Sequence, residues 1–272
     1  MIDLHCHMLP GIDDGAPDLD TALEMAKLAV ADGITVTACT PHIYPGLYLN
    51  DAAGIARGVE GLRSALEDAG IGLTLTYGAD IQIIPELLAG LRDGHLPTLH
   101  KSRYFLFEPP HHTVPARFHE TIHDCVAAGY VPVITHPERL TWLDDAHYPW
   151  FEQAARNGAW IQLTAGAVTG GFGRRAKYWA ERMLDDGMVH ILASDGHDPR
   201  HRPPLLAEGR EAAEQWVGPA EAERLVLGRQ QAILDNQDPS TVPPPPMFDP
   251  SVSSSRRPAP SKGWLSKLFS WD

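Results

Sequence analysis

The chain has 272 residues, 43% of them hydrophobic and 21% charged, which is enough apolar material to bury a full core. Its formal net charge of −13 argues against a nucleic-acid partner, because such proteins depend on a basic face. Three scattered cysteines argue against a disulfide framework, and no stretch approaches the roughly 18 to 20 apolar residues of a membrane span. Because the opening MIDLHCH also lacks a basic-then-apolar leader, a cytoplasmic location is expected.

Short apolar runs alternate with helical patterns over the first 235 residues. Seven strands are expected, at 2–4, 34–39, 73–77, 104–107, 131–135, 160–163 and 190–193. Helices are expected near 52–69, 84–92, 116–128, 147–156, 174–186 and 204–235, the last broken near Gly218. The alternation is typical of parallel α/β folds, and seven strand–helix units favour a (β/α)7 barrel.

The first helix has the clearest signals. Asp18 or Asp20 can cap its start, and Gly33 is expected to end it. One apolar face is expected to be buried, formed by Leu19, Leu23, Ala26 and Val30.

The composition changes after residue 235, so the barrel is assigned to 1–235. Residues 236–262 are rich in proline and serine and predict a disordered linker. Residues 263–272 carry Trp264, Leu268 and Trp271 on one side of a possible short helix. Such an amphipathic end is a candidate for contact with a membrane surface.

Histidines and carboxylates follow the expected strands. The carboxyl ends of barrel strands are where active sites assemble, so these side chains are expected to converge. His5 and His7 flank Cys6 on an extended segment, which points both imidazoles the same way. Burying so many ionisable groups is costly unless a cation compensates, and mixed nitrogen and oxygen ligands suit manganese, iron or zinc. The candidates include His5, His7, His42, Asp80, Glu108, His136, Asp195 and His197.

Four motifs resemble one known family. HCHMLPGIDDGA at the start, TPHIY at 40–44, THPER at 135–139 and SDGH at 194–197 are similar to PHP-superfamily tyrosine-protein phosphatases of the capsule and exopolysaccharide type. The resemblance covers roughly 1–235 and implies a distorted (β/α)7 barrel with three divalent ions, assigned first as manganese. The ligands it implies are His5, His7, Asp14, His42, Asp80, Glu108, His136, Asp195 and His197. Asp80 departs from the family's usual glutamate, so its metal is expected to sit differently or bind more weakly.

The resemblance also implies how phosphate is bound. Arg139 and Arg202 match arginines that the family uses to hold it, and a guanidinium fork suits phosphate oxygens. Three divalent ions and four carboxylates leave the cluster with a charge of about +2, or about +1 with a bridging hydroxide. A phosphate dianion is therefore attracted locally to an acidic protein.

The expected reaction is in-line hydrolysis of phosphotyrosine by a metal-bound hydroxide, with His42 or a bound water as the acid. A cysteine mechanism is not expected, because no arginine stands six positions after any cysteine. Tyr44, Tyr48 and Phe172 are expected only at the rim, and 166–173 as a mobile loop at the barrel mouth.

The sequence is also compatible with two other classes of function. One is another PHP enzyme, acting on a small ester such as histidinol phosphate or on nucleic acid. The other is a non-catalytic relative that holds metal or phosphopeptide. If the chain is a phosphatase, the resemblance implies that its partner is a bacterial tyrosine autokinase that controls polysaccharide export. The enzyme would then be expected to contact the inner face of the membrane peripherally.

Overall fold

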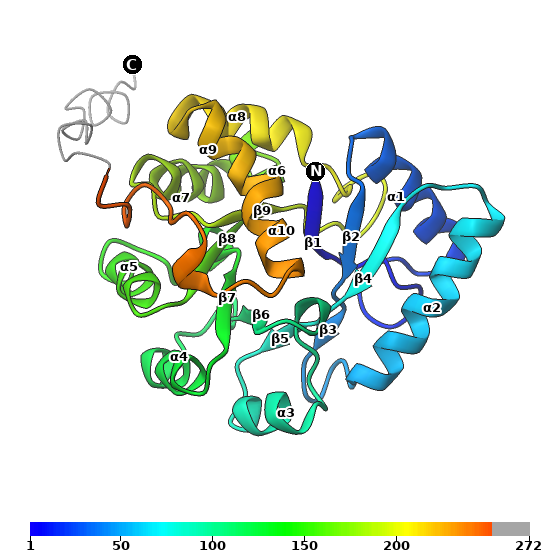
Figure 1. The fold of residues 1–272 in the computed structure, drawn as a ribbon, viewed down its shortest axis with the longest axis horizontal. Coiled ribbons are helices and arrows are strands. Elements are labelled where there is room, and N and C mark those ends of the chain that lie inside the picture. Colours follow the sequence, from blue (N-terminus) through cyan, green and yellow to red (C-terminus); the bar gives the residue numbers. More distant parts are fainter. Residues whose placement is uncertain (252–272) are drawn as a thin grey trace, which may run out of the picture.

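The computed structural model describes residues 1–251, in which parallel strands alternate with helices (Figure 1). One sheet has the order β1-β2-β4 and the other β3-β5-β6-β7-β8-β9. The strands of the first sheet are β1 (Ile2–Cys6), β2 (Val36–Cys39) and β4 (Thr74–Tyr77). Those of the second are β3 (His42–Ile43), β5 (Asp80–Gln82), β6 (Tyr104–Glu108), β7 (Val131–Thr135), β8 (Trp160–Thr164) and β9 (Ile191–Ala193).

Each of the seven expected strands overlaps an observed one, and β3 and β5 are additional. These two short strands follow β2 and β4 after breaks of two residues. They pair with each other in parallel, with His42 opposite Asp80. At each break the chain therefore passes from the first sheet to the second, and the next strand begins with an expected ligand, His42 in β3 and Asp80 in β5.

The two sheets meet at the carboxyl end of β1. Cys6 forms an isolated parallel bridge with Gly196, the His7 amide donates to Gly196 O at 2.8 Å, and the Asp195 amide donates to His5 O at 2.8 Å. One apolar cluster draws on strands of both sheets, including Leu4, Leu106 and Val133. Among the described residues, strand pairing yields two sheets rather than one closed barrel.

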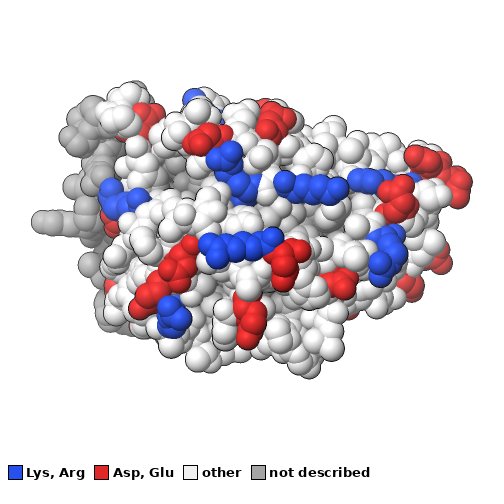
Figure 2. All heavy atoms as spheres, turned by 60° about the horizontal axis from the view of Figure 1, so that its bottom comes forward, with Lys and Arg blue, Asp and Glu red and all other residues white. Residues whose placement is uncertain are grey.

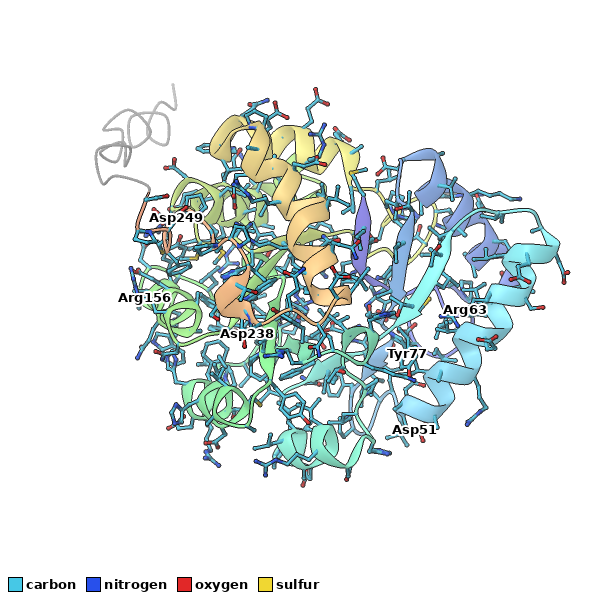
Figure 3. All side chains as sticks on the ribbon, viewed as in Figure 1. Asp51, Arg63, Tyr77, Arg156, Asp238 and Asp249 are labelled. Atoms are coloured by element: carbon cyan, nitrogen blue, oxygen red, sulfur yellow. The ribbon has the colours of Figure 1, made fainter. Side chains whose placement is uncertain are left out.

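Helices cover the outside of the sheets (Figure 1). Asp18 caps α1 (Leu19–Ala31) and accepts from the Thr21 amide at 2.9 Å, and Asp51 caps α2 (Ala52–Asp68) in the same way through Gly54 (Figure 3). The expected buried face of α1 is wrong in part, since Leu19 and Val30 are 44% and 39% exposed. Small side chains allow closer packing, and the buried face is Ala22, Met25, Ala26 and Ala29.

The remaining helices lie close to their expected positions. They are α3 (Leu87–Asp93), α4 (Phe118–Ala127), α5 (Tyr148–Arg156), α7 (Gly173–Asp185), α8 (Ala207–Val217), α9 (Pro219–Glu223) and α10 (Arg229–Leu234). The break at Gly218 is confirmed, with φ of 79° at that residue. A correction concerns the loop expected at 166–173, because α6 (Ala165–Thr169) occupies its first part and ends at Gly170.

The first part of the segment expected to be a disordered linker differs from that expectation. Residues 236–251, the strap, lie against the domain: Val242 is buried, the Met247 amide donates to Gly187 O, and Arg103 pairs with Asp238 at 3.1 Å. The strap runs from Asp238 to Asp249 past α5 (Figure 3). Its apolar side chains and backbone find partners on the domain, which composition alone did not reveal. The expected amphipathic segment 263–272 and the rest of the linker lie outside the described residues.

No helix within residues 1–251 is long and apolar enough to cross a membrane. Figure 2 shows acidic side chains interspersed among the basic ones on the face that it presents.

Candidate metal centre

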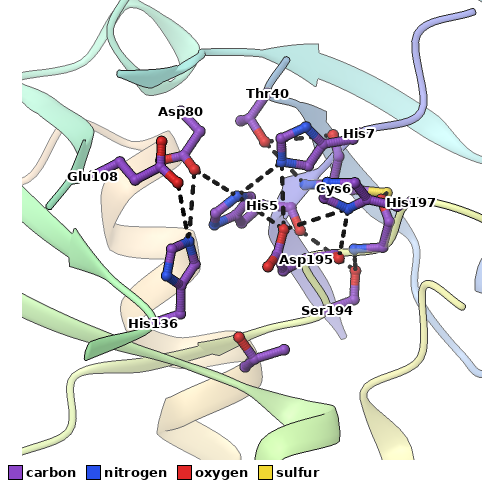
Figure 4. A network of polar contacts seen from close by, with 12 residues as sticks. His5, Cys6, His7, Thr40, Asp80, Glu108, His136, Ser194, Asp195 and His197 are labelled. Atoms are coloured by element: carbon purple, nitrogen blue, oxygen red, sulfur yellow. Dashed lines mark hydrogen bonds and ion pairs between the residues drawn. The ribbon is translucent and has the colours of Figure 1, made fainter. Parts of the chain in front are cut away.

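The nine expected ligands converge at the carboxyl ends of the strands. Their nitrogen and oxygen atoms form overlapping groups in which all ligand atoms lie within 4.8 Å of one another. Figure 4 shows the central part of this arrangement. The groups are His7–Asp14–His42–His197, His5–His7–Asp80, His5–His136–Asp195, His42–Asp80–Glu108 and Glu108–His111–His136. The sequence therefore identified every member of these groups except His111.

His5 and His7 form the middle of the centre. Their Nε2 atoms are 3.1 Å apart, and the Asp195 Oδ1 atom lies 3.3 Å from the first and 3.4 Å from the second. Cys6 points away, with its thiol 3.5 Å from Gly196 O. The two imidazoles thus face one point with a carboxylate oxygen, as the alternation along an extended chain predicts.

Asp80 provides the test of whether the residues fit a cation. Its side chain is fully buried, and neither carboxylate oxygen has a hydrogen-bond partner. The Oδ2 atom lies 3.4 Å from His5 Nε2 and 3.7 Å from His136 Nε2. A buried carboxylate without hydrogen bonds is costly unless a cation compensates it. With imidazole nitrogens on two sides, the donor set fits a divalent ion.

Two of the expected ligands have a backbone conformation that L-residues rarely adopt. His136 has φ of 36° and Asp195 φ of 50°, each just after a strand. Such geometry costs on the order of 1–3 kcal/mol per residue and persists only where the surroundings enforce it. The Asp195 amide is held by His5 O, and the preceding Ser194 by Asp3, which accepts from the Ser194 amide at 3.0 Å and from its hydroxyl. Burial raises the pKa of Asp3 to about 6 despite these bonds.

Asp13 orients two of the histidines, and the sequence did not single it out. Its Oδ2 accepts from His7 Nδ1 at 2.7 Å and from the His42 amide at 3.0 Å, and its Oδ1 from the Gly15 amide at 2.9 Å. A carboxylate behind a ligating histidine fixes the tautomer and the ring orientation. A Cβ on Gly15 would lie 2.1 Å from His7 O, so the turn requires glycine. Gln162 supports His5 similarly, with its Oε1 2.9 Å from His5 Nδ1.

The histidines differ in their protonation without metal. Burial by itself lowers the pKa of His5, but the carboxylates of Asp195 and Asp80 raise it to about 9. Burial also opposes charge on His42, where the neighbouring Glu108 raises the pKa to about 10. These two imidazoles therefore carry protons near neutral pH.

His136 and His197 behave in the opposite way. Burial and the guanidinium of Arg139 lower the pKa of His136 to about 4, and burial together with His7 does the same for His197. Both rings are therefore neutral near pH 7 and ready to act as ligands.

Arg139 and Arg202 share one carboxylate. Both donate to Asp195 Oδ2, Arg202 at 2.7 Å, while the other oxygen of Asp195 faces the histidines. Phe172 stands behind them, with its ring centre 4.4 Å from Arg139 Cζ and 5.7 Å from Arg202 Cζ. Gly166 makes room for this ring, since a Cβ there would lie 3.1 Å from it. Two like charges are thereby held side by side.

A cavity of about 210 Å³ opens over this arrangement. Metal-ligand candidates line one part, the two arginines another, and Tyr44, Leu47 and Tyr48 the rim. Tyr44 and Leu47 are 40% and 62% exposed, and Tyr48 stacks on His42 with ring centres 5.7 Å apart. The cysteines are elsewhere: all three are free and buried, and burial raises the pKa of Cys39 to about 12 and of Cys125 to about 11.

Together, the fold and the site define a parallel α/β protein with a histidine–carboxylate metal centre and an adjacent arginine pair. Residues 1–235 match the family described as capsular polysaccharide synthesis, CpsB/CapC. Tyrosine-protein phosphatase YwqE of Bacillus subtilis is 32% identical over 247 residues, 91% of this chain and 96% of the relative. Putative tyrosine-protein phosphatase CapC of Staphylococcus aureus is 30% identical over 208 residues, 76% and 81% of the two chains. The chain therefore belongs to the CpsB/CapC family.

Solved structures agree with this assignment. One, from work on YwqE of B. subtilis and CpsB of Streptococcus pneumoniae as metal-dependent tyrosine phosphatases, has a TM-score of 0.82 at 32% identity. It covers 88% of this chain and 96% of its own. A β-aspartyl dipeptidase from Fervidobacterium islandicum, with a TM-score of 0.53 at 16% identity, shares the fold alone.

Sequence reasoning missed three residues of the site, and it expected Phe172 at the rim, whereas the ring packs against Arg139 and Arg202. Asp13 had a signal, because it lies in the DDG run of the first motif, and so did His111, because it follows Glu108 by three positions. Gln162 had none, since it reaches the site only through its place in the fold.

Proposed function

We propose that this chain is a metal-dependent protein-tyrosine phosphatase, a hydrolase of phosphoric monoesters. The observation that carries the proposal is a single cavity in which an arginine pair borders the metal-ligand candidates. Membership of a family with relatives named as tyrosine-protein phosphatases supports it.

Two arginines are proposed to bind the phosphate ester, and two neighbouring residues hold them in position. Arg139 and Arg202 supply fork-shaped donors for its oxygens, and Asp195 and Phe172 hold those donors in place. Divalent ions, when bound, polarise the ester and generate a nucleophile at neutral pH. His42 lines this cavity and is 14% exposed, but as a metal ligand it is expected to lose its proton, so a bound water is the proposed proton donor to the leaving oxygen.

The rim favours an aromatic ester. Tyr44 and Leu47 line the same cavity as Arg139 and Arg202 and are 40% and 62% exposed, so they offer apolar surface near the proposed phosphate-binding groups. A phosphotyrosine side chain places its ring one bond from the phosphate, so both parts are accommodated together. The phenolate is also a better leaving group than an alkoxide, since its acid has a pKa of about 10.

The proposal includes three ions, manganese first and iron or zinc as alternatives, within a distorted (β/α)7 barrel. Nine mixed nitrogen and oxygen ligands in overlapping groups support more than one ion. The bridge between Cys6 and Gly196 and the apolar cluster shared by both sheets support the barrel.

The proposed substrate is a cytoplasmic, phosphotyrosine-bearing bacterial tyrosine kinase that controls capsule or exopolysaccharide synthesis. The description of the family supports this role. The residues at 263–272 are proposed to bring the enzyme to the membrane. Fractionation of cells that express residues 1–251 tests this point, since membrane association equal to that of the full chain would reject it.

The first experiment is hydrolysis of phosphotyrosine peptide, phosphoserine peptide and histidinol phosphate by protein loaded with manganese. A chelator-treated sample and His136→Ala serve as controls. Release from phosphotyrosine that depends on metal and on His136 is the expected result. Activity confined to histidinol phosphate would replace the substrate, and inactivity on every ester at full metal occupancy would favour a non-catalytic relative.

A further inference from the structure

His111 lies beside the expected metal ligands, on the segment that follows β6. Its Nε2 is 3.6 Å from Glu108 Oε1, and its ring centre is 5.0 Å from that of His136. It also lines the cavity of about 210 Å³ together with those two residues. The side chain is 31% exposed, so it faces the cavity without being buried away from it.

The distances around Glu108 suit a shared cation. Its Oε1 lies 3.6 Å from His111 Nε2 and 3.8 Å from His136 Nε2, and both separations exceed hydrogen-bond length. Ligand atoms roughly 2 Å from one ion are separated by distances of this order. The other oxygen of Glu108 faces His42 at 3.4 Å, so Oε1 remains free for the outer side of the centre.

The backbone around His111 is fixed before any ligand binds. Its carbonyl accepts from the Thr141 amide at 2.9 Å and from the Thr141 hydroxyl at 3.0 Å. The preceding Pro110 carbonyl accepts from the Trp142 indole at 2.8 Å. Three hydrogen bonds thus tie this segment to the one that follows His136, which keeps the two histidines at a constant separation.

We propose that His111 is a tenth metal ligand, completing with Glu108 and His136 the coordination of the ion on the outer edge of the centre. This inference rests on the proposed metal-dependent function but concerns only how one ion is held. A third protein ligand at the mouth of the cavity keeps that ion in place while leaving positions open for water or an ester oxygen.

His112 provides a matched control. It is the adjacent histidine, its side chain is exposed, and its Nδ1 is 3.3 Å from the Thr141 hydroxyl instead of facing the centre. His111→Ala is expected to weaken the affinity for the most loosely held Mn²⁺ at least about tenfold in competition with a chelator, since even groups behind a ligand contribute that much. His112→Ala is expected to leave the affinity unchanged.

A second pair of variants tests coordination directly. With Co²⁺ bound, His111→Cys should show a thiolate-to-cobalt charge-transfer band that is absent from the wild type and from His112→Cys. Equal Mn²⁺ affinity for His111→Ala and wild type, or cobalt uptake by His111→Cys without the band, would overturn the assignment. Neither measurement requires turnover. If the wild type itself bound no Mn²⁺ or Co²⁺, the proposed function would fail as well.

Discussion

Asp13→Asn is the substitution whose effect follows most directly from the geometry. Asp13 uses one oxygen for His7 Nδ1 and the His42 amide, at 2.7 and 3.0 Å, and the other for the Gly15 amide. Asparagine has the same shape but presents one NH2 group where an acceptor is needed. A donor then faces a donor whichever way the amide is turned, at either His7 or Gly15.

The size of the effect can be estimated in two ways. Leaving a buried donor unsatisfied costs about 1–3 kcal/mol. Removing the partner behind a ligating histidine typically weakens metal binding about 10- to 100-fold, or about 1.4–2.7 kcal/mol. The two ranges agree, so we expect Mn²⁺ affinity to fall by about one to two orders of magnitude. Activity should largely return at saturating Mn²⁺, because no ligand has been removed.

The assay is Mn²⁺ binding by chelator competition, with phosphatase activity titrated against Mn²⁺ in parallel. Asp20→Asn is the matched control, because Asp20 is an exposed aspartate in the first turn of α1. Affinities of Asp13→Asn and Asp20→Asn that cannot be distinguished would refute the reasoning. So would a loss of activity that saturating Mn²⁺ does not restore.

Three further predictions concern the arginine pair, the protonation of His5 and His42, and the strap. Phe172→Leu should weaken phosphate inhibition about 2- to 30-fold, because a cation–π contact contributes about 0.5–2 kcal/mol, whereas Phe172→Tyr should retain it. Mn²⁺ binding at pH 7 should release about two protons, since the pKa values of His5 and His42 are about 9 and 10 without metal, and apparent affinity should therefore rise from pH 7 to 9. Phe248→Ala should lower the free energy of unfolding by about 1–2 kcal/mol at unchanged activity, because the half-buried ring stacks on His190 at 5.9 Å.

Each of these has a direct measurement. Inhibition constants for inorganic phosphate decide the first, and equal values for leucine and tyrosine at position 172 would contradict the cation–π role. Calorimetry in two buffers of different ionisation enthalpy counts the protons, and a count near zero would mean that both imidazoles are already neutral. Urea unfolding tests the strap. If Phe248→Ala unfolds at the same midpoint urea concentration as the wild type, the ring of Phe248 contributes no stability.

The sequence by itself determined the type and order of most elements and all but one of the candidate metal ligands that the fold brings together. Short apolar runs rich in β-branched residues specify strands locally, and the candidate ligands lie at or directly after their ends along the chain. Parallel strands bring their carboxyl ends to one edge, so residues as distant as His5 and His197 were expected to meet. The capping of α1 by Asp18 was also readable, because a cap depends on residues three positions apart.

Only the tertiary structure decided which side chains support those candidate ligands and that residues 236–251 pack against the domain. Gln162 and Phe172 act through partners that they meet only once the strands are paired, so no local pattern indicated the support that they give to His5 and to the arginine pair. Packing likewise chose the alanine face of α1 over the Leu19 face, because small side chains bring the helix closer to the sheet. The strap is ordered because the folded domain presents His190 and Arg156 to Phe248, and a composition rich in proline carries no information about that surface.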